Sequence, residues 1–333
     1  MKKMERREFL NTFFLGAAGS SLFRPSIKFK RLLRSSDKPQ DETGVLAQVL
    51  GTAQDGGIPQ MGCYCRNCLQ AREEARFTRL VSSIALFDFI EKKYFILDAT
   101  PDIRIQSDRA LDRLRIEKRG RKNAPDEILL THAHIGHYTG LMYFGYEAMS
   151  TQNLPVYCTS RMGRFLSDNG PWSQLVSLEN ISLHTLHPGK EISLTPRIAL
   201  TPLLVPHRNE YSDTIGFRIS GEKKKLLYIP DIQSWEAWNR SIVEEVEKVD
   251  IALLDGTFYS LEELPGRNLA KIGHPLIQTS LKTLGKVALK GQTQICFTHL
   301  NHSNLALDPE REERKKIREK GFRLASEGEE FSL

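Results

Sequence analysis

The chain has 333 residues, of which 40% are hydrophobic and 26% charged, and this is enough apolar surface to bury the core of one large α/β domain. Its formal net charge is +6, but residues 1–40 hold ten of the 47 Lys and Arg residues and three of the 41 Asp and Glu residues. The remaining 37 basic and 38 acidic residues give a net charge of −1. The body of the chain therefore lacks the basic excess typical of nucleic-acid-binding proteins, and no nucleic-acid partner is expected.

Residues 1–23 resemble a twin-arginine export signal, because Arg6 and Arg7 stand just before Phe9, Leu10 and an apolar run. The run is short and rich in Gly, Ala and Ser, whereas a membrane span needs about 20 apolar residues. We expect the twin-arginine export machinery to be a partner and the protein to be exported to the periplasm. Because no A-x-A cleavage site follows, the segment could remain as an anchor facing the periplasm. The alternative is a disordered basic tail on a cytoplasmic protein.

Residues 24–44 are basic and then polar, with Pro and Ser, and are predicted to link this signal to a folded domain over residues 45–333. In that domain, short β-rich runs alternate with helical patterns. The predicted strands lie at 45–50, 84–89, 94–98, 127–130, 155–158, 197–205, 214–219, 225–229, 250–254 and 293–297. The predicted helices lie at about 104–116, 233–247 and 275–284. Hairpin-like strands mixed with helices favour an α/β (α+β) protein with two sheets and helices outside them.

The stretch "THAHIGHYTGL" after the predicted strand at 127–130 clusters three histidines, His132, His134 and His137. In an extended chain the first two project the same way, and a following helical turn brings the third into the same space. Neutral imidazoles are good ligands for zinc, iron, nickel or manganese ions, and three that converge are typical of a catalytic metal site. The cluster therefore predicts a metal-dependent enzyme.

"HAHIGH" resembles the H-x-H-x-D-H signature of the metallo-β-lactamase superfamily, with Gly136 where that family usually has aspartate. The family's other site positions appear in order along the chain at strand ends: Asp98 after "YFIL", ahead of this motif, and then His207 after "TPLLVP", Asp231 after "KLLYIP" and His299 after "TQICFT". The resemblance covers nearly everything from Val45 to the C-terminus. It implies a four-layer αββα sandwich of the metallo-β-lactamase type.

The resemblance also implies one or two catalytic divalent metals, with zinc, manganese and iron as candidates. The implied ligands are His132, His134 and His207 for one ion, His137 and His299 for the other, and Asp231 as a bridge between them. Asp98 would orient a ligand histidine.

Gly136 removes a carboxylate from the second site, so that site is expected to bind more weakly but still to exist. By the same argument Gly136→Asp is expected to tighten it. Asp55 in "QDGG" is a speculative replacement ligand, while a simple turn residue is the plainer interpretation.

"GCYCRNC" places Cys63, Cys65 and Cys68 where three thiolates can converge on one structural zinc ion. The rival interpretation is one disulfide with a free thiol, which an oxidising compartment would favour. Cys158 and Cys296 lie in apolar strand patterns and are predicted to be core residues.

The loop "GTAQDGGIPQMGCYCRNC" resembles one branch of the superfamily, the pyrroloquinoline quinone biosynthesis protein B and the cyclic phosphodiesterase of phosphonate breakdown. In the phosphodiesterase branch, this resemblance implies that His302, three residues after His299, is the fourth ligand of the structural zinc. It also implies that His274 is a general acid, with a helix cap as the alternative. His184 and His187 match no family position, and we expect them on the surface.

The function predicted from these motifs is hydrolysis of a phosphodiester or related ester of a small molecule, with a metal-bound hydroxide as the nucleophile. His274 would protonate the leaving oxygen. The first alternative is a protein like pyrroloquinoline quinone biosynthesis protein B, with iron and oxygen chemistry on a precursor peptide. The second is a non-catalytic metal-binding protein. The oligomeric state is open, and a homodimer is one option.

Overall fold

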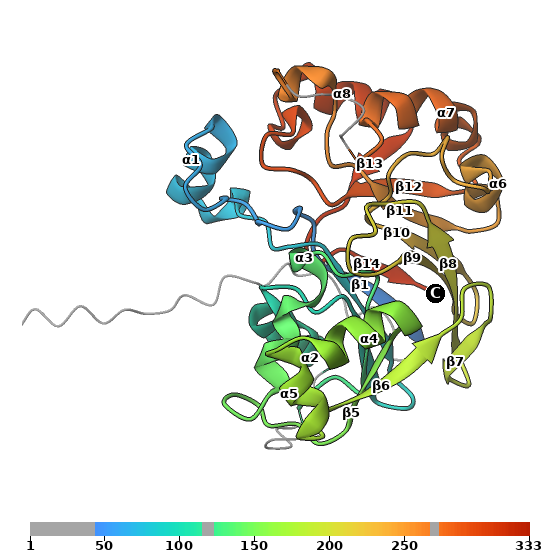
Figure 1. Ribbon diagram of the computed structural model, residues 1–333. Coiled ribbons are helices and arrows are strands. Elements are labelled where there is room, and N and C mark those ends of the chain that lie inside the picture. The colour runs from blue at the N-terminus through green and yellow to red at the C-terminus, as the bar shows by residue number, and fades with distance from the viewer. Residues whose placement is uncertain (1–43, 115–122, 267–272) are drawn as a thin grey trace, which may run out of the picture. The chain divides into compact units, whose positions relative to one another are not determined.

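The computed structural model describes residues 44–114, 123–266 and 273–333, which form two β-sheets packed face to face with helices on both outer faces (Figure 1). The predicted export signal at 1–23 and nearly all of the predicted linker at 24–44 lie outside the described residues and stay predictions. Within the described ranges, no helix is long and apolar enough to cross a membrane.

The first sheet has the strand order β14-β1-β2-β3-β4-β5-β6. Pairing is antiparallel from β14 to β3 and parallel from β3 to β6. Its strands are β1 (Val45–Gly51), β2 (Ser83–Asp88), β3 (Lys93–Leu97), β4 (Glu127–Leu129), β5 (Leu154–Thr159), β6 (Ile181–Leu186) and β14 (Glu330–Ser332). Because β3 and β4 are parallel, their carboxyl ends meet at one edge of the sheet.

The second sheet has the order β13-β12-β11-β10-β9-β8-β7, antiparallel from β7 to β10 and parallel from β10 to β13. Its strands are β7 (Ile192–Thr195), β8 (Ile198–Val205), β9 (Thr214–Ser220), β10 (Lys225–Ile229), β11 (Ile251–Asp255), β12 (Gln294–Thr298) and β13 (Phe322–Leu324). Strands β8, β10, β11 and β12 all run in one direction, so their carboxyl ends also share an edge.

Each sheet carries its own helices, as Figure 1 shows. The first sheet packs against α2 (Ile103–Leu114), α4 (Ser160–Asp168) and α5 (Trp172–Ser177), and the second against α6 (Ile242–Glu247), α7 (Ile277–Lys290) and α8 (Glu312–Glu319). Two further helices, α1 (Arg66–Glu73) and the single turn α3 (Ile135–Tyr138), belong to the candidate metal sites. Short 3-10 helices are η1 (Ala75–Phe77), η3 (Thr139–Phe144), η4 (Leu261–Glu263) and η6 (Leu305–Leu307).

Three apolar layers hold the sandwich together. The layer between the sheets includes Val49, Leu97, Ile215 and Tyr228. Between the first sheet and its helices lie Ile96, Val156 and Leu166, and between the second sheet and its helices lie Leu254, Leu284 and Ile317. Every strand of the two inner sheets thus has apolar partners on its faces, and the predicted αββα order of layers is confirmed.

The predicted strands are confirmed to within one residue at each end, whereas two helices differ from the prediction. The helix expected over 233–247 is wrong for residues 233–241, which form turns before α6 begins. The buried side chains of Trp235 and Trp238 hold those turns, because their indole N–H groups donate to Ser280 Oγ and Leu204 O at 2.9 and 2.7 Å. Helix α7 runs six residues past its predicted end, to Lys290.

Candidate metal centre

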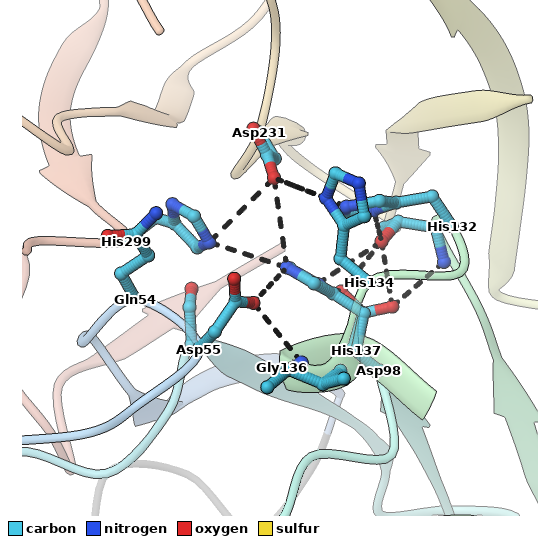
Figure 2. Close-up of polar contacts among 12 residues, drawn as sticks. Gln54, Asp55, Asp98, His132, His134, Gly136, His137, Asp231 and His299 are labelled. Atoms are coloured by element: carbon cyan, nitrogen blue, oxygen red, sulfur yellow. Dashed lines mark hydrogen bonds and ion pairs between the residues drawn. The ribbon is translucent and has the colours of Figure 1, made fainter. Parts of the chain in front are cut away.

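The carboxyl ends of strands from both sheets meet at one site (Figure 2). His132 and His134 follow β4, and α3 then brings His137 to the same place. From the second sheet come the residues that follow β8, β10 and β12, which are His207, Asp231 and His299. All six residues that the sequence assigned to the catalytic metals therefore lie together.

The first group of possible ligands converges on a single oxygen, Oδ2 of Asp231. His132 Nε2 lies 3.2 Å from it, His207 Nε2 3.1 Å and His134 Nδ1 3.8 Å. His207 Nε2 and His134 Nδ1 are 3.1 Å apart. Ligands about 2.1 Å from one tetrahedral ion are separated by about 3.4 Å, so this spacing suits a single zinc-sized ion.

A second group faces the same oxygen from the other side. His137 Nε2 and His299 Nε2 are 3.3 Å apart and lie 4.0 and 3.9 Å from Asp231 Oδ2. Asp55 joins these two histidines in a set whose ligand atoms lie within 4.8 Å of one another. Asp231 is thus between both groups, where a bridging carboxylate would have to be.

At His132, His137 and His299, hydrogen bonds to the outer nitrogen Nδ1 leave the inner Nε2 facing the cluster. The Thr131 hydroxyl donates to Asp98 and so accepts from His132 Nδ1 at 2.9 Å. His137 Nδ1 lies 2.7 Å from Asp98 Oδ2. The Thr257 hydroxyl likewise donates to Asp255 and accepts from His299 Nδ1 at 3.0 Å.

These contacts fix the tautomer in which each inner Nε2 has a lone pair to offer a metal. Asp98 lies where the sequence had suggested an orienting carboxylate. Two of these residues have a strained left-handed backbone, Asp98 with φ of 70° and His299 with φ of 58°, which is common where the surrounding structure fixes a functional residue.

The burial of one imidazole nitrogen also fits a role as a metal ligand. His132 Nε2 is buried without a hydrogen-bond partner in the described part of the chain, and Asp231 Oδ2, which can only accept, lies 3.2 Å from it. Leaving such an atom unpaired costs about 1–3 kcal/mol, so atoms that instead share a metal ion explain the arrangement. The donor set of imidazole and carboxylate suits zinc, manganese or iron.

Burial and nearby charges shift the pKa values of the histidines in this cluster, downward at some and upward at others. Burial lowers the pKa of His132 and of His299, which favours the neutral form that binds metal. Burial also disfavours a charged His137, but the carboxylates of Asp98, Asp55 and Asp231 outweigh it and raise the pKa to about 9. A bound dication would lower the pKa of His137, because it binds only the neutral imidazole.

His274 lies beside this cluster together with Asp255 and Thr257, which the sequence analysis did not single out. Its Nδ1 is 2.9 Å from Asp255 Oδ2, 3.1 Å from Thr257 Oγ1 and 3.2 Å from Asp231 Oδ1. Asp255 is the last residue of β11, so the strand-end rule that marked Asp98 could also have found it. His274 and Asp255 form another group with metal-ligand spacing together with Asp231 and His299.

A separate cluster joins Cys63 and Cys65, which lie just before α1, and Cys68, which lies in α1, to His302, which follows β12. Cys63 Sγ and Cys65 Sγ both lie 3.4 Å from His302 Nδ1, and Cys68 Sγ belongs to the same group. All three cysteines are free thiols. Sulfur and nitrogen ligands of one tetrahedral zinc ion are about 3.6 Å apart, so these four could hold zinc.

The other singled-out residues lie where the sequence placed them. Cys158 and Cys296 are buried in β5 and β12, and burial raises the pKa of each thiol to about 12. His184 and His187 are exposed.

A cleft of about 510 Å³ lies between the two candidate metal clusters. It is lined by Gln54, Asp55, Gly56, Gln60, Met61, Ile135, Phe258, Glu263, Leu264, Asn301, His302 and Ser303. Asp55 and Gln54 connect it to the histidine cluster, because Asp55 lies 3.7 Å from His137 Nε2 and Gln54 Nε2 lies 3.4 Å from His274 Nε2. A small molecule in the cleft would therefore reach the site.

A sequence profile described as "Beta-lactamase superfamily domain" matches residues 93–300, which is more than half of the chain. The chain belongs to this superfamily. Its two sheets and their flanking helices are the metallo-β-lactamase fold that the sequence predicted.

Relatives within this superfamily include the coenzyme PQQ synthesis protein B of Rhizobium meliloti, which is 27% identical over 305 residues, covering 86% of this chain and 97% of that protein. The same protein of Pseudomonas paraeruginosa is 28% identical over 315 residues, covering 86% and 99%.

Two solved structures share the fold. Zn²⁺-bound PqqB from Methylobacterium extorquens superposes with a TM-score of 0.73 at 23% identity, and the match covers 86% of this chain and 100% of the PqqB chain. A diphosphatase of the PhnP family superposes with a TM-score of 0.63 at 22% identity, covering 87% and 97%. Both belong to the branches that the cysteine loop resembles.

Proposed function

We propose that the chain is a metal-dependent hydrolase of a phosphodiester or a related ester. The observation that carries this proposal is the pair of histidine groups that face Asp231 from opposite sides, with His274 next to them. His132, His134 and His207 would hold one ion, His137 and His299 the other, and Asp231 both. Ions bound there would activate a water molecule as the nucleophile near neutral pH and offset charge in the transition state.

His274 is the group best placed to donate a proton to the leaving oxygen. Asp255 and Thr257 hold its Nδ1, so that Nε2 is directed toward Gln54 at the cleft. Burial disfavours the charged ring, but Asp255 and Asp231 outweigh it and raise the pKa of His274 to about 10. Asp255 is not a proposed metal ligand, so it would still favour the charged imidazole when bound ions offset the charge of Asp231, and the ring could supply the proton that a general acid needs.

The cleft would bind the rest of the substrate. Gln54, Gln60 and Asn301 provide amide groups, while Met61 and Phe258 provide apolar surface. Such a mixture suits a small molecule with polar and apolar parts better than a purely ionic one.

The cysteine cluster would hold a structural zinc ion with no part in the reaction. Cys63, Cys65, Cys68 and His302 leave no open position on a tetrahedral ion, and this is typical of structural sites.

The relatives support a second candidate, a role like that of coenzyme PQQ synthesis protein B, with iron and oxygen chemistry. Its support is the match over nearly the whole length of those relatives. The two candidates predict different reactions and different co-substrates, so one experiment separates them.

The test is metal analysis of the full chain purified without added metal, followed by assays on bis(p-nitrophenyl) phosphate, p-nitrophenyl phosphate and p-nitrophenyl acetate. We expect two or three equivalents of divalent metal and diester hydrolysis that a chelator abolishes. His274→Gln should keep its metal and lose most turnover, while His187→Gln, which changes an exposed histidine, should behave like wild type. Iron with oxygen uptake and no hydrolysis would favour the second candidate, and a fully metallated protein that cleaves no ester would contradict the first.

A further inference from the structure

Gly136 is a glycine for reasons of space. It lies in α3 and is not among the glycines with positive φ, so its backbone suits other residues equally well. A Cβ atom added there would lie 2.2 Å from Asp55 Oδ1, 2.7 Å from Asp55 Cα and 3.0 Å from Asp55 Cγ. Ordinary contacts of this kind are 3.4–4 Å. Any side chain at position 136 would therefore overlap with Asp55.

Asp55 fills this space with a carboxylate. Its Oδ1 accepts a hydrogen bond from the Gly136 N–H at 3.1 Å and lies 3.7 Å from His137 Nε2, as Figure 2 shows. His137 Nε2 is in turn 3.3 Å from His299 Nε2. Atoms that bind one ion at about 2.1 Å lie about 3–4 Å from one another, so these spacings suit a shared ion.

Backbone hydrogen bonds hold Asp55 beside His299. Ala53 bridges to Val81 on one side and to Leu300 on the other, and the Gln54 N–H donates to Leu300 O at 2.9 Å. The Gly57 N–H closes a turn onto Gln54 O at 2.8 Å. Because Leu300 directly follows His299, the loop carrying Asp55 is fixed to the segment that supplies one histidine of the second site.

We propose that Asp55 is the carboxylate ligand of the second metal site, supplied by the loop after β1, and that Gly136 is required to admit it. The proposal rests on the proposed metal-dependent function. A carboxylate at position 136 itself is excluded by the same geometry. The structure therefore reverses the expectation that Gly136→Asp would tighten the second site, because the new side chain would collide with the Asp55 loop.

A turn residue that only bonds the Gly136 N–H is the competing role for Asp55, and charge separates the two. Asp55→Asn keeps the size and an oxygen that can accept this hydrogen bond, but it removes the negative charge that binds a cation. Asp112→Asn is the matched control, since Asp112 is exposed on α2 and loses the same charge far from any candidate ligand group.

The test is a Zn²⁺ titration of the metal-depleted full chain in competition with a chromogenic chelator, which reports stoichiometry and affinity without any substrate. We expect Asp55→Asn to weaken one of the two histidine sites tenfold or more, with the other site and the cysteine cluster unchanged. Asp112→Asn should match wild type. Equal affinities for Asp55→Asn and wild type, or a wild-type chain with only one Zn²⁺ at the histidines, would overturn the proposal.

Gly136→Ala provides an independent arm. Its methyl group should push Asp55 out and weaken the same site in the wild-type background, but should add little in the Asp55→Asn background, because the charged ligand is already gone. If the losses of Zn²⁺ affinity in the two single variants add fully in the double variant, the proposal is overturned. If Gly136→Ala does not fold, Asp55→Asn alone decides the test. A wild-type chain that binds no Zn²⁺ at the histidines would overturn the proposed function as well, whereas two bound ions indifferent to Asp55→Asn would leave that function standing.

Discussion

Asp231 lies within 4.0 Å of five histidines through one oxygen, Oδ2, while Oδ1 faces His274 at 3.2 Å. Burial alone would raise the pKa of Asp231, but the surrounding histidines hold it well below its usual range. The carboxylate therefore stays charged inside the protein, as a ligand for two cations must.

Asp231→Ala should consequently be the most damaging single change at the site. It removes one ligand from each proposed ion, so we expect loss of at least one catalytic ion and a fall in turnover of on the order of a hundredfold or more. Metal analysis and diester hydrolysis measure both effects.

The zinc ion proposed for the cysteine cluster should remain in Asp231→Ala, because that cluster shares no ligand with Asp231. His184→Ala is the control, since His184 is exposed and stacks on Tyr157 away from the site. An active and fully metallated Asp231→Ala protein would contradict the two-metal assignment.

Single residues of the site were predictable where they follow a strand and match the family pattern, as Asp98 and Asp231 do. Asp255 ends a strand in the same way, but nothing in the sequence says which of several strand-end carboxylates points inward. The overlap of Asp55 with position 136 brings together a loop and the helical turn α3, 81 residues apart, and a pattern along the chain does not report such contacts.

At the scale of elements, α1 and the loop before it have little apolar support. The helix buries only Cys68 and Ala71, and its small apolar cluster adds Ala53 and Ile58. Such a segment needs another source of stability, and a zinc ion is the usual one.

Cys65→Ser should therefore release about one zinc ion and destabilise the fold before it affects hydrolysis. Cys65 Sγ lies 3.4 Å from His302 Nδ1, and a hydroxyl there is a much poorer zinc ligand. Cys158→Ala, which removes a buried thiol from β5, should lower stability but keep its zinc. Unchanged zinc content and melting in Cys65→Ser would disprove the structural zinc.

The 3-10 helix η4 predicts a pH dependence of stability. Its last residue, Glu263, accepts hydrogen bonds at Oε1 from the N–H groups of Tyr259 and Ser260, while Oε2 is buried without a partner among the described residues. Burial raises the pKa of Glu263 to about 7, from 4.5, despite these donors. The folded protein thus binds a proton that the unfolded chain has released, so stability falls as pH rises from 4.5 to about 7 and then stays level.

Glu263→Gln keeps the capping interactions but cannot titrate. The unfolding free energy of wild type relative to this variant should therefore fall by about 3 kcal/mol as the pH rises from 4.5 to 7.5. Urea unfolding at several pH values measures this, and effects shared by both proteins, such as histidine titration, cancel. Parallel curves would show that Glu263 has an ordinary pKa.

Elements with strong periodicity were predictable, and elements that depend on tertiary contacts were not. Strand β10 matches its prediction at both ends, because both of its faces are apolar. The turns at 233–241 resemble a helix in sequence, but Trp235 and Trp238 donate hydrogen bonds to Ser280 and Leu204, which are distant in the chain, and a local pattern does not report such contacts. The short edge strands β13 and β14 carry too few residues for a pattern.

Over the whole molecule, the histidine site joins the two halves of the sandwich. His132, His134 and His137 belong to the first sheet, while His207, Asp231 and His299 belong to the second. Each proposed ion would take ligands from both sheets, so it would bind only when both halves are folded and packed together, and its binding free energy would add to the stability of the whole fold.

Removing the ions should lower the free energy of unfolding by about 2.7 kcal/mol for each site that was held at a hundred times its dissociation constant. For a domain of this size the melting temperature would fall by roughly 5 °C or more. Thermal melts of the full chain with and without a chelator measure the shift. In Asp231→Ala the chelator should no longer cause the part of the melting shift that is due to the histidine site. In Cys65→Ser it should no longer cause the part that is due to the cysteine cluster.

Hydrogen exchange separates this linkage from a local effect. If the ions join the sheets, chelation should speed exchange at the carboxyl ends of β4 in one sheet and of β10 and β12 in the other, and by similar factors, because the same opening exposes all three. Faster exchange confined to the loop of His132 and His134 would mean that the metal orders only that loop. An unchanged chelator shift in Asp231→Ala would likewise contradict the coupling, since the stabilising ion would then lie elsewhere.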